Sequence, residues 1–535
     1  IPATAERVLF PMPDGSTRAA WNTVVQTGAE GWYDAVVDAG TGEVLVRRNL
    51  WESDHNNGEA NVFLEQHPQI PGAAQQDFDF PANWADDSGN TIGNNSDAWH
   101  DPDGDDSAGY RPDTGDPGDA NFRHFNYTYT DAINSNPAAT GTDWVTDRDS
   151  VITQAFYYTN MLHDHWYQYG FDEASGNFQE DNFGLGGDDG DRVNVLVDWN
   201  ADNGECCNAS MATPDDGDNP FLRLRVGLMP DNRNMHRAMN GDTVTHEFGH
   251  GVSNRLVGGG DLGSGVQTNG MGEGWSDAMA FSLWNDPVYG EYNNGNNTTG
   301  IRGVAYDTSG LQYDDICNGG CEEHNDGEVW ATALWDVRDA LIGRYGQADG
   351  TFRFEHLMID GMKNTPTDPS FLDARDGILA SNVDLHGGVD TCLIWAAFAV
   401  TGMGSDADDD GGGSSPTNGF AVPAACIPTA DAGGPYAVNE GATIQLDATG
   451  STPGTDPGAS TDLTYAWDFD GDAQFDDATG AQPTFGPIGD NMVINVAVQV
   501  TSGDGISDTD STTVTVLNVA PSVAFSPLQV SVIDE

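Results

Sequence analysis

The chain has 535 residues, which exceeds the length of one ordinary domain and predicts two or three. Its 85 aspartates and glutamates outnumber its 19 lysines and arginines, so the formal net charge at pH 7 is −66. This balance argues against nucleic acids and anionic membranes as partners, and its self-repulsion at low ionic strength indicates a saline environment or bound cations such as calcium. No segment approaches the roughly 20 apolar residues of a membrane span.

The first 150 residues divide into two parts. Residues 1–49 alternate apolar and polar side chains, most clearly at 21–25 and 31–38, and a turn is expected at 39–42. This part is therefore predicted to form a small β unit. Residues 50–150 are rich in Asp, Asn, Gly and Pro, which predicts loops.

The middle of the chain predicts strands followed by helices. A helix is expected from Ser150 to Tyr169, and strands are expected at 193–197 and 221–226. Three later helices are expected, around His246, around Glu273 and at 328–345. This order predicts two lobes, one rich in strands and one helical, with a cleft between them.

The last quarter of the chain changes in composition. Residues 405–416 combine Gly, Ser and Asp, which predicts a linker, and the pattern after Cys426 becomes all-β. The chain begins at Ile1 without a methionine or a signal peptide and stops at Glu535. We therefore expect a fragment that lacks an export signal and a C-terminal continuation.

The six cysteines indicate an oxidising, extracellular setting, because their number is even and the chain is acidic and poor in lysine. Possible pairs are Cys317 with Cys321, Cys392 with Cys426, and the adjacent Cys206 and Cys207, which otherwise remain thiols.

The pattern H-E-F-G-H at residues 246–250 is the most informative feature. On a helix, His246 and His250 lie one turn apart on one face, so both imidazoles can bind one metal ion. Glu247 projects from the edge of that face and can contact a metal-bound water without binding the ion. Glu273, on the next expected helix, supplies a third ligand, which leaves the fourth position of a zinc ion to water.

The same segment has the pattern of an amphipathic helix. Val244, Phe248, Val252 and Leu256 form a ridge spaced by four residues that faces away from the two histidines. Asp242 is expected to cap the start of the helix. The helix thus has an apolar back for a core and a polar front for a cleft, and an accidental match on a solvated helix is the alternative.

Other groups of possible metal ligands are weaker. Acidic runs at 101–106, 188–191 and 406–410 offer oxygen ligands to calcium, but none matches the EF-hand loop, and solvated loops are the alternative. The His-Asp-His run at 163–165 is expected to be structural, because residues i and i+2 of a helix point apart.

Longer stretches around these residues carry a family resemblance. The sequences HEFGHGVSNRL at 246–256 and GMGEGWSD at 270–277 resemble the fungalysin family of secreted metalloendopeptidases, a distant relative of thermolysin. Shorter matches lie at 162–164, 170–174, 177–179, 208–209, 300–302 and 324–331. The resemblance covers roughly residues 50–427. It implies an α+β, thermolysin-like peptidase with the zinc helix between a β-rich N-terminal lobe and a mainly helical C-terminal lobe.

The resemblance also implies an activity. The chain is expected to be a secreted, zinc-dependent endopeptidase that hydrolyses peptide bonds of extracellular proteins through a metal-activated water. His246, His250 and Glu273 would bind one catalytic Zn²⁺, and Glu247 would be the general base. Asp277, one helical turn after Glu273, would orient a zinc-binding histidine, with an exposed helix carboxylate as the alternative.

Further roles are implied for residues outside the zinc motif. His324 matches a histidine that donates to the developing oxyanion, although its usual aspartate partner has no equivalent and a glutamate at 322–323 would replace it. Arg302 resembles an arginine that binds a substrate carbonyl, and a structural ion pair is the alternative. Asn208 and Ala209 resemble an edge strand that pairs with extended peptide substrates. The family's preference is an apolar residue on the leaving-group side of the cut.

The N-terminal residues resemble part of a precursor. The sequence DAGTGEVL at 38–45 resembles the end of the propeptide in thermolysin-like precursors. Residues 1–49 would then be the C-terminal part of a propeptide that inhibits or assists folding of a zymogen, and an N-terminal β subdomain is the alternative. The peptidase domain would cover residues 50–427.

The C-terminal residues resemble a PKD domain, an immunoglobulin-like β-sandwich. The sequences that carry this are GGPY at 433–436, LDATGS at 446–451 and YAWDFD at 465–470, with Trp467 as the buried aromatic residue. The PKD domain would cover residues 428–519, and residues 520–535 would begin a second, truncated repeat. Such a module either binds insoluble substrate or acts as a spacer.

Two other functions are compatible with these patterns. A catalytically silent, adhesive extracellular protein fits the PKD module and the high charge, but it need not retain all four residues of the zinc site. An exopeptidase needs a pocket for the terminal amine, which no pattern identifies. For the endopeptidase we expect protein or peptide substrates and a monomer.

Overall fold

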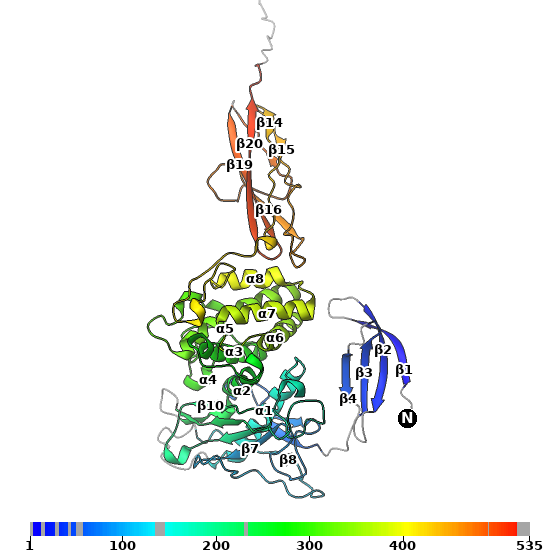
Figure 1. Cartoon of the computed structure of the whole chain (residues 1–535), viewed down its shortest axis with the longest axis vertical. Helices are drawn as coiled ribbons and strands as arrows, with labels where there is room; N and C mark the ends of the chain where they lie inside the picture. Colours follow the sequence, from blue (N-terminus) through cyan, green and yellow to red (C-terminus); the bar gives the residue numbers. More distant parts are fainter. Residues whose placement is uncertain are drawn as a thin grey trace, which may run out of the picture. The chain divides into compact units, whose positions relative to one another are not determined.

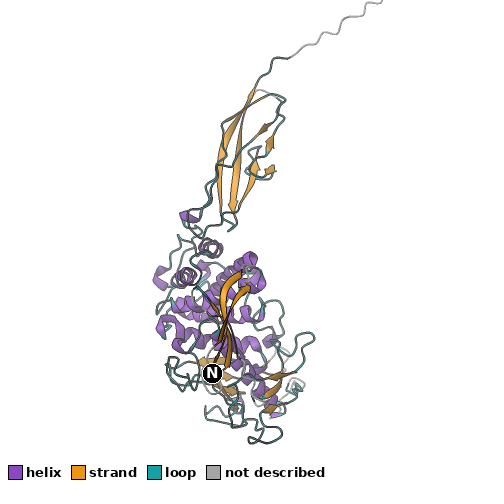
Figure 2. Ribbon diagram, turned by 90° about the vertical axis from the view of Figure 1, so that its right-hand side faces the viewer, coloured by secondary structure: helices purple, strands orange, loops and turns teal. Residues whose placement is uncertain are grey.

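The computed structural model of the chain describes residues 4–11, 17–26, 32–40, 44–49, 57–133, 145–228, 234–489 and 492–521. Helices and sheets are both present, so the prediction of a chain that combines them is confirmed (Figure 1, Figure 2). The chain divides into two compact units, Ile1–Ser381 with Asp408–Asn418, and Asn382–Ala407 with Gly419–Glu535. Within the described residues, no helix has both the length and the apolar character that crossing a membrane requires.

The N-terminal residues form an antiparallel sheet in which each strand pairs with the next along the chain. Its strands are β1 (Thr4–Pro11), β2 (Thr17–Gln26), β3 (Trp32–Asp38) and β4 (Val44–Asn49). The predicted β structure of this part is confirmed. Of the turn expected at 39–42, residues 39–40 form a turn, and the other two lie outside the described residues.

The region from 50 to 150 contains more regular structure than the loops predicted for it. A three-stranded sheet joins β5 (Glu59–Val62), β6 (Gln76–Asp79) and β8 (His124–Phe125) in the order β6-β5-β8. These strands are short and rich in polar residues. The alternation of apolar and polar side chains that predicts a strand is therefore too brief to be recognised in the sequence.

A mixed four-stranded sheet lies at the centre of the strand-rich part. Its order is β10-β11-β9-β7, with β10 (Ala209–Ala212) at one edge of the described strands, followed by β11 (Phe221–Leu224), β9 (Val193–Val197) and β7 (Ser96–His100). Strands β7, β9 and β11 are parallel, and β10 is antiparallel to β11. The strand predicted at 221–226 is interrupted at Arg225, after which β12 (Val226–Leu228) pairs with β13 (Asn234–His236).

The helices follow in the order expected. They are α1 (Arg148–Tyr167), α2 (Gly241–Leu256), α3 (Val266–Trp284), α4 (Glu291–Asn294), α5 (Glu323–Tyr345), α6 (Gln347–Lys363) and α7 (Phe371–His386). Helix α1 packs against β5, β7 and β9, and α2 packs against α1, α3 and β10. Helix α2 therefore lies between the strand-rich part and the later helices.

Helix α2 has the buried ridge predicted from its sequence. Val244, Phe248, Val252 and Leu256 are each at most 4% exposed. Its cap differs from the prediction, because the side chain of Asn240 accepts the hydrogen bond from the backbone N–H of Asp242 at 3.1 Å.

Asp242 is instead buried, and its side chain accepts hydrogen bonds from two other segments of the first unit. Its carboxylate accepts hydrogen bonds from the side chain of Gln66 and, at 2.9 Å, from the backbone N–H of Gly290. Burial, reinforced by the charge of Glu291, raises the pKa of Asp242 well above its ordinary value. Asp242 was predicted as the cap because aspartate is a favoured capping residue, but Asn240, two positions earlier, occupies the capping geometry.

The segment predicted as a linker at 405–416 is partly held by the first unit. Gln267 of α3, which is fully buried, donates hydrogen bonds to the carbonyls of Asp409 at 2.9 Å and Gly413 at 3.0 Å. A Gly- and Ser-rich composition predicts flexibility only when no partner takes up the backbone carbonyls.

The second unit contains helix α8 (Thr391–Val400) and two sheets. A five-stranded sheet has the order β14-β20-β19-β16-β17, and a second sheet pairs β15 with β18. Their bounds are β14 (Tyr436–Asn439), β15 (Ile444–Gln445), β16 (Leu463–Asp468), β17 (Ala478–Thr479), β18 (Thr484–Phe485), β19 (Val493–Ser502) and β20 (Ser507–Leu517). Trp467 is fully buried in the core between them, as predicted, and its indole N–H donates to the carbonyl of Gly480 at 2.9 Å.

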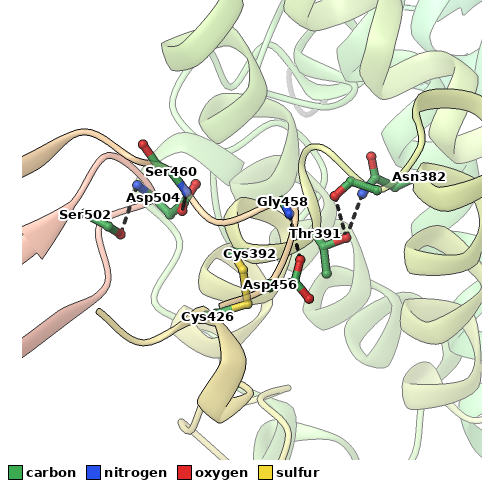
Figure 3. The surroundings of a disulfide bond; sticks show 10 residues. Asn382, Thr391, Cys392, Cys426, Asp456, Gly458, Ser460, Ser502 and Asp504 are labelled. Atoms are coloured by element: carbon green, nitrogen blue, oxygen red, sulfur yellow. Dashed lines mark hydrogen bonds between the residues drawn. A yellow bond between two sulfur atoms is a disulfide. The ribbon is translucent and has the colours of Figure 1, made fainter. Parts of the chain in front are cut away.

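The six cysteines form three disulfides, Cys206–Cys207, Cys317–Cys321 and Cys392–Cys426. The predicted presence of disulfide bonds is confirmed. The Cys392–Cys426 bond joins α8 to the segment before β14, near the buried Asp504, which accepts a hydrogen bond from the backbone of Ser460 (Figure 3).

A buried arginine ties the end of α2 to the segment that precedes β9 and to the loop that follows β10. The guanidinium of Arg255 binds Asp191 at 2.7 Å and donates to the carbonyls of Gly176 at 2.9 Å and Pro214 at 3.1 Å. We expect Arg255→Met to lower the free energy of unfolding by about 3–5 kcal/mol, because it leaves the buried Asp191 carboxylate without its cation. Urea unfolding followed by tryptophan fluorescence measures this. Arg192→Met, which breaks a half-exposed ion pair with Glu180, is the control, and equal losses in the two variants would contradict the prediction.

Candidate metal centre

Three side chains from two helices converge on one point. The Nε2 atoms of His246 and His250, one turn apart on α2, are 3.1 Å apart. The carboxylate of Glu273 on α3 approaches both, with Oε2 3.3 Å from His246 Nε2 and Oε1 3.3 Å from His250 Nε2. The structure thus brings together the three residues predicted as metal ligands.

The chemistry of this donor set fits a zinc ion. One ligand atom from each residue lies within 4.8 Å of the other two. Ligands about 2.0–2.1 Å from a tetrahedral zinc ion stand roughly 3.3 Å apart, which agrees with the separations above. His246 and Glu273 are largely buried, while His250 is half-buried, so the point can be reached from one side.

Asp277 fixes the orientation of His246. Its Oδ1 lies 2.7 Å from His246 Nδ1, which places an imidazole N–H on this side and directs Nε2 toward Glu273. Burial opposes a charge on His246, but hydrogen bonds to Asp277 and Glu273 outweigh it and raise the pKa of the imidazole to about 10. The environment of this imidazole therefore favours a positive charge, whether a proton or a metal ion.

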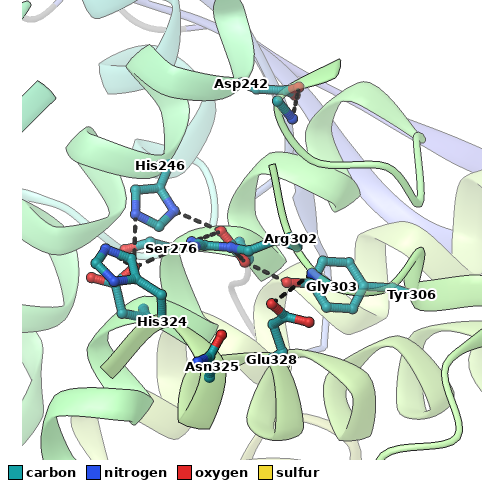
Figure 4. A network of polar contacts seen from close by, with 12 residues as sticks. Asp242, His246, Ser276, Arg302, Gly303, Tyr306, His324, Asn325 and Glu328 are labelled. Atoms are coloured by element: carbon teal, nitrogen blue, oxygen red, sulfur yellow. Dashed lines mark hydrogen bonds and ion pairs between the residues drawn. The ribbon is translucent and has the colours of Figure 1, made fainter. Parts of the chain in front are cut away.

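Asp277 is itself held by two residues of the following loop, Arg302 and Tyr306, both of which are labelled in Figure 4. Arg302 donates from Nε to Oδ2 at 2.8 Å and from Nη2 to Oδ1 at 2.9 Å, and the hydroxyl of Tyr306 also donates to Oδ2. Burial alone would raise the pKa of Asp277, but the charge of Arg302 and the hydrogen bond from His246 lower it. The carboxylate is therefore ionised beside the donor set.

Tyr306 and Tyr289 were not identified from the sequence. The ring of Tyr289 lies 5.0 Å from that of His246, and the guanidinium of Arg302 lies 4.8 Å from the same tyrosine ring. Both tyrosines are buried and belong to the segment between α3 and α5, which carries no motif of its own. Only the match at 300–302 pointed to this segment.

Arg302 lies behind Glu273 and is 8% exposed. Besides its two bonds to Asp277, its Nη2 donates to Glu273 Oε2 at 3.2 Å. These contacts correspond to the structural ion pair considered as an alternative, and contact with a substrate carbonyl stays a prediction.

Glu247 is placed beside the donor set without belonging to it. It is 7% exposed, and no described residue donates a hydrogen bond to its carboxylate. Burial raises the pKa of Glu247, and the neighbouring histidines act in the opposite direction. Its oxygens are available to a water or a substrate group.

His324 lies in the first turn of α5, with 46% of its side chain exposed. Its Nε2 is 3.6 Å from Glu273 Oε2, and its Nδ1 is 2.6 Å from Glu322 Oε1. Glu322 also caps α5 by accepting from the backbone N–H of Asn325 at 2.9 Å. Of the two glutamates suggested as supports for His324, Glu322 is the one that contacts its ring, and the supporting role stays a prediction.

Asn208 and Ala209 lie where edge strand β10 begins. Ala209 pairs with Leu224 of β11, and the carbonyl of Asn208 accepts from the backbone of Arg225 at 3.3 Å. Strand β10 packs against α2, where a methyl group on Gly251 would stand 2.8 Å from the Cε of Met211. The predicted edge strand thus lies alongside the helix that carries the histidines.

The other predicted groups of ligands differ from the donor set on α2 and α3. In the His-Asp-His run of α1, His163 contacts Asp164 at 3.0 Å, while His165 points to Glu355 at 3.1 Å. The two histidines of this run therefore have separate partners and do not approach a common point. One oxygen from each of Asp101, Asp103 and Asp105 lies within 4.8 Å of the others, and calcium binding there stays a prediction.

Comparison with known proteins agrees with this geometry. Residues 50–407 match the sequence model of the fungalysin metallopeptidase (M36) family. The chain is 34% identical over 381 residues to extracellular metalloproteinase 5 of Arthroderma otae, which covers 65% of this chain and 57% of that protein. It is 32% identical over 443 residues to extracellular metalloproteinase MEP of Pyricularia oryzae, covering 75% of this chain and 66% of that protein. The matched part thus spans about three fifths of each relative's length.

We expect the purified chain to bind one zinc ion with its three convergent ligands. His250→Ala and Glu273→Ala should abolish stoichiometric zinc, and Asp277→Asn should weaken zinc affinity about 10–100-fold, because it loosens the orientation of His246. Metal analysis by mass spectrometry and competition with a chromogenic chelator measure both. His165→Ala, which removes an imidazole outside the site, is the control, and unchanged zinc content in Glu273→Ala would contradict the ligand set.

Proposed function

Because the chain belongs to the fungalysin metallopeptidase (M36) family, we propose that it is a secreted zinc endopeptidase that hydrolyses peptide bonds of extracellular proteins. The observation that carries this proposal is the convergence of His246, His250 and Glu273 within 3.3 Å. Glu247 lies next to His246 on the same helix, and no described residue donates a hydrogen bond to its carboxylate. The relatives are named extracellular metalloproteinases, which supports secretion.

In the proposed site, His246, His250 and Glu273 hold one zinc ion. When bound, zinc supplies Lewis-acid chemistry, because it polarises a carbonyl and lowers the pKa of water toward neutrality. The two imidazoles and one carboxylate leave the complex with a net positive charge, which suits a site that must stabilise a developing oxyanion.

Glu247 is the proposed general base. It takes a proton from the attacking water and later delivers a proton to the leaving amine. Its burial favours this exchange, because a carboxylate in a poorly solvated place binds a proton more readily than one in water. The lack of a hydrogen-bond donor from the described residues leaves both of its oxygens free for these steps.

Asp277 is the proposed positioning residue of the site. Its contact with His246 Nδ1 holds the ring so that Nε2 faces Glu273. Arg302 in turn holds both carboxylates, which keeps α3 and the loop after it in one arrangement. We also propose that Arg302 donates a hydrogen bond to a substrate carbonyl. For this contact, one of its N–H groups would have to turn from the two carboxylates toward the substrate.

His324 is the proposed donor to the oxyanion. Its half-exposed imidazole lies at the rim of the donor set, and the contact between its Nδ1 and Glu322 orients the ring so that Nε2 faces Glu273. In this orientation an Nε2–H would be the donor to the reacting carbonyl.

Substrate would bind in extended form along β10, with its backbone paired to Asn208 and Ala209. The position of β10 at the sheet edge and beside α2 supports this. Because such pairing recognises the backbone of the substrate and not its side chains, the enzyme would accept many sequences.

The remaining architecture is proposed by analogy with the same family. Residues 1–49 would be the end of a propeptide that inhibits the enzyme or assists its folding, and residues 50–427 a two-lobed, thermolysin-like peptidase that acts as a monomer. Residues 428–519 would be an immunoglobulin-like PKD sandwich, which the two sheets around Trp467 support. Of residues 520–535, proposed as a second repeat, most lie outside the described residues.

We expect Glu247→Gln to retain zinc and lose about 10²–10⁴-fold in kcat on casein, because the amide cannot accept the proton. Removal of the metal by a chelator should abolish cleavage, and added zinc should restore it. Glu323→Gln, an exposed residue of α5, is the matched control. Full activity after complete removal of the metal would contradict the proposal, and inactivity of the zinc-loaded wild type would favour the silent adhesive protein.

Replacement of the proposed oxyanion donor should act on turnover more than on binding. We expect His324→Ala to lower kcat about 10²–10³-fold with little change in KM, because the contact is made only in the transition state. Glu322→Gln should have a smaller effect of the same kind. Steady-state kinetics on a fluorogenic peptide measures both, and a rise in KM at constant kcat would instead indicate ground-state binding.

A further inference from the structure

Two arginines next to the start of the proposed substrate strand have hydrogen-bond donors without partners among the described residues. Arg237 follows β13 and is 8% exposed. Its Nη2 donates to the carbonyl of Cys207 at 3.3 Å, while its Nε is buried without a partner among the described residues. Arg225, between β11 and β12, also has its Nε and Nη1 buried without a hydrogen-bond partner in this part of the chain.

The backbone places these arginines next to the proposed substrate strand. The N–H of Arg225 donates to the carbonyl of Asn208, and the N–H of Arg237 donates to the carbonyl of Arg225, both at 3.3 Å. The three residues thus form a row from the start of β10 to the segment that precedes α2. Burial lowers the pKa of both guanidinium groups, and the charge of Glu247 acts in the opposite direction.

Arg237 differs from two other buried arginines of the first unit. Arg255 and Arg302 each bind a carboxylate within 2.8 Å. Arg237 forms no ion pair with a described residue, and the carboxylate that Arg225 approaches, Glu205, is 3.6 Å away and half exposed.

Burial without an ion pair is not by itself enough to indicate a binding site. The buried Arg338 also has an Nε without a hydrogen-bond partner among the described residues. Arg237, in contrast, contacts the residue that precedes Asn208, at the start of the proposed substrate strand. A buried cation without an anion costs several kcal/mol, and this position is what points to a role in binding.

We propose that Arg237 and Arg225 bind a carboxylate of the substrate close to the scissile bond, so that the enzyme prefers an acidic residue at one position where the family resemblance implies an apolar one. This inference rests on the proposed peptidase function. A guanidinium can pair with a carboxylate through two parallel hydrogen bonds, and each of these arginines has at least one N–H group without a hydrogen-bond partner among the described residues. In a chain with a net charge of −66, acidic peptides are otherwise repelled, so a local pair of cations decides where an acidic side chain is accepted.

The test compares peptides that differ only in Glu or Gln at each position flanking the cut, with amidated C-termini. We expect kcat/KM of the wild type to be at least about tenfold higher for Glu at one of these positions, a difference of about 1.4 kcal/mol. Arg237→Met should bring the Glu/Gln ratio near one, and Arg225→Met should lower it in part. Arg223→Met, which removes a cation of β11 paired with Asp106 at 2.7 Å, should leave the ratio unchanged.

Two further arms separate the possible explanations. Peptides with a free C-terminal carboxylate distinguish a chain terminus from an acidic side chain as the source of the recognised group. Arg237→Lys keeps the charge without the paired donors, so an intermediate ratio is expected, and it provides a second variant if Arg237→Met does not fold.

A binding measurement keeps this inference separate from the peptidase proposal. In zinc-loaded Glu247→Gln, fluorescence anisotropy should give tighter binding of the Glu peptide than of the Gln peptide, and this difference should vanish when Arg237→Met is added. Such binding without any turnover by the wild type would overturn the peptidase function alone. Equal handling of Glu and Gln peptides, or an equal loss for both in Arg237→Met, would overturn the carboxylate site and leave the arginines as counter-charges to Glu247.

Discussion

The close approach of helices α2 and α3 is the constraint on which the candidate site depends. His246 and His250 belong to one helix and Glu273 to the other, so their ligand atoms meet only if the two helix axes are near each other. Gly249 allows this, because a side chain there would stand 2.9 Å from the Cα of Ser276. Helix α5 approaches from the other side in the same way, since a Cβ on Gly327 would lie 2.5 Å from the Cβ of Glu273. Gly249 and Gly327 thus allow α2 and α5 to pack closely against α3, and this packing fixes the position of the Glu273 carboxylate.

The electrostatics of the site follow from this packing. Glu247, Glu273 and Asp277 are largely buried in a small volume, which is unfavourable for ionised carboxylates unless cations compensate them. Arg302 provides one cation for Asp277 and Glu273, and the imidazoles share their charge with the same two groups. A metal ion at the donor set would complete the balance. The shortage of basic residues in the chain, 19 against 85 acidic ones, makes the placement of each buried arginine informative.

Much of the site could be predicted because its geometry is local. The spacing of His246 and His250 is fixed by one turn of helix, and the ridge from Val244 to Leu256 identifies which face of that helix is buried. The contact of Asp277 with His246 could be anticipated from its place one turn after Glu273. The cap at Asn240, the interruption at Arg225 and the anchoring of Gln267 to the segment after α8 could not, because each depends on a partner distant in sequence.

The sequence by itself determined which residue types are available for metal chemistry and which helices carry them, because periodicity and motif spacing are properties of neighbouring residues. Tertiary structure alone decided that Glu322 contacts His324, that Tyr289 and Tyr306 lie beside the donor set, and that Arg237 is buried without an ion-pair partner among the described residues. These outcomes depend on loops whose sequences carry no periodic signal. The positions of their side chains are fixed only when strands and helices far apart in the chain pack together. The energy of that packing depends on long-range contacts, which no local sequence pattern predicts.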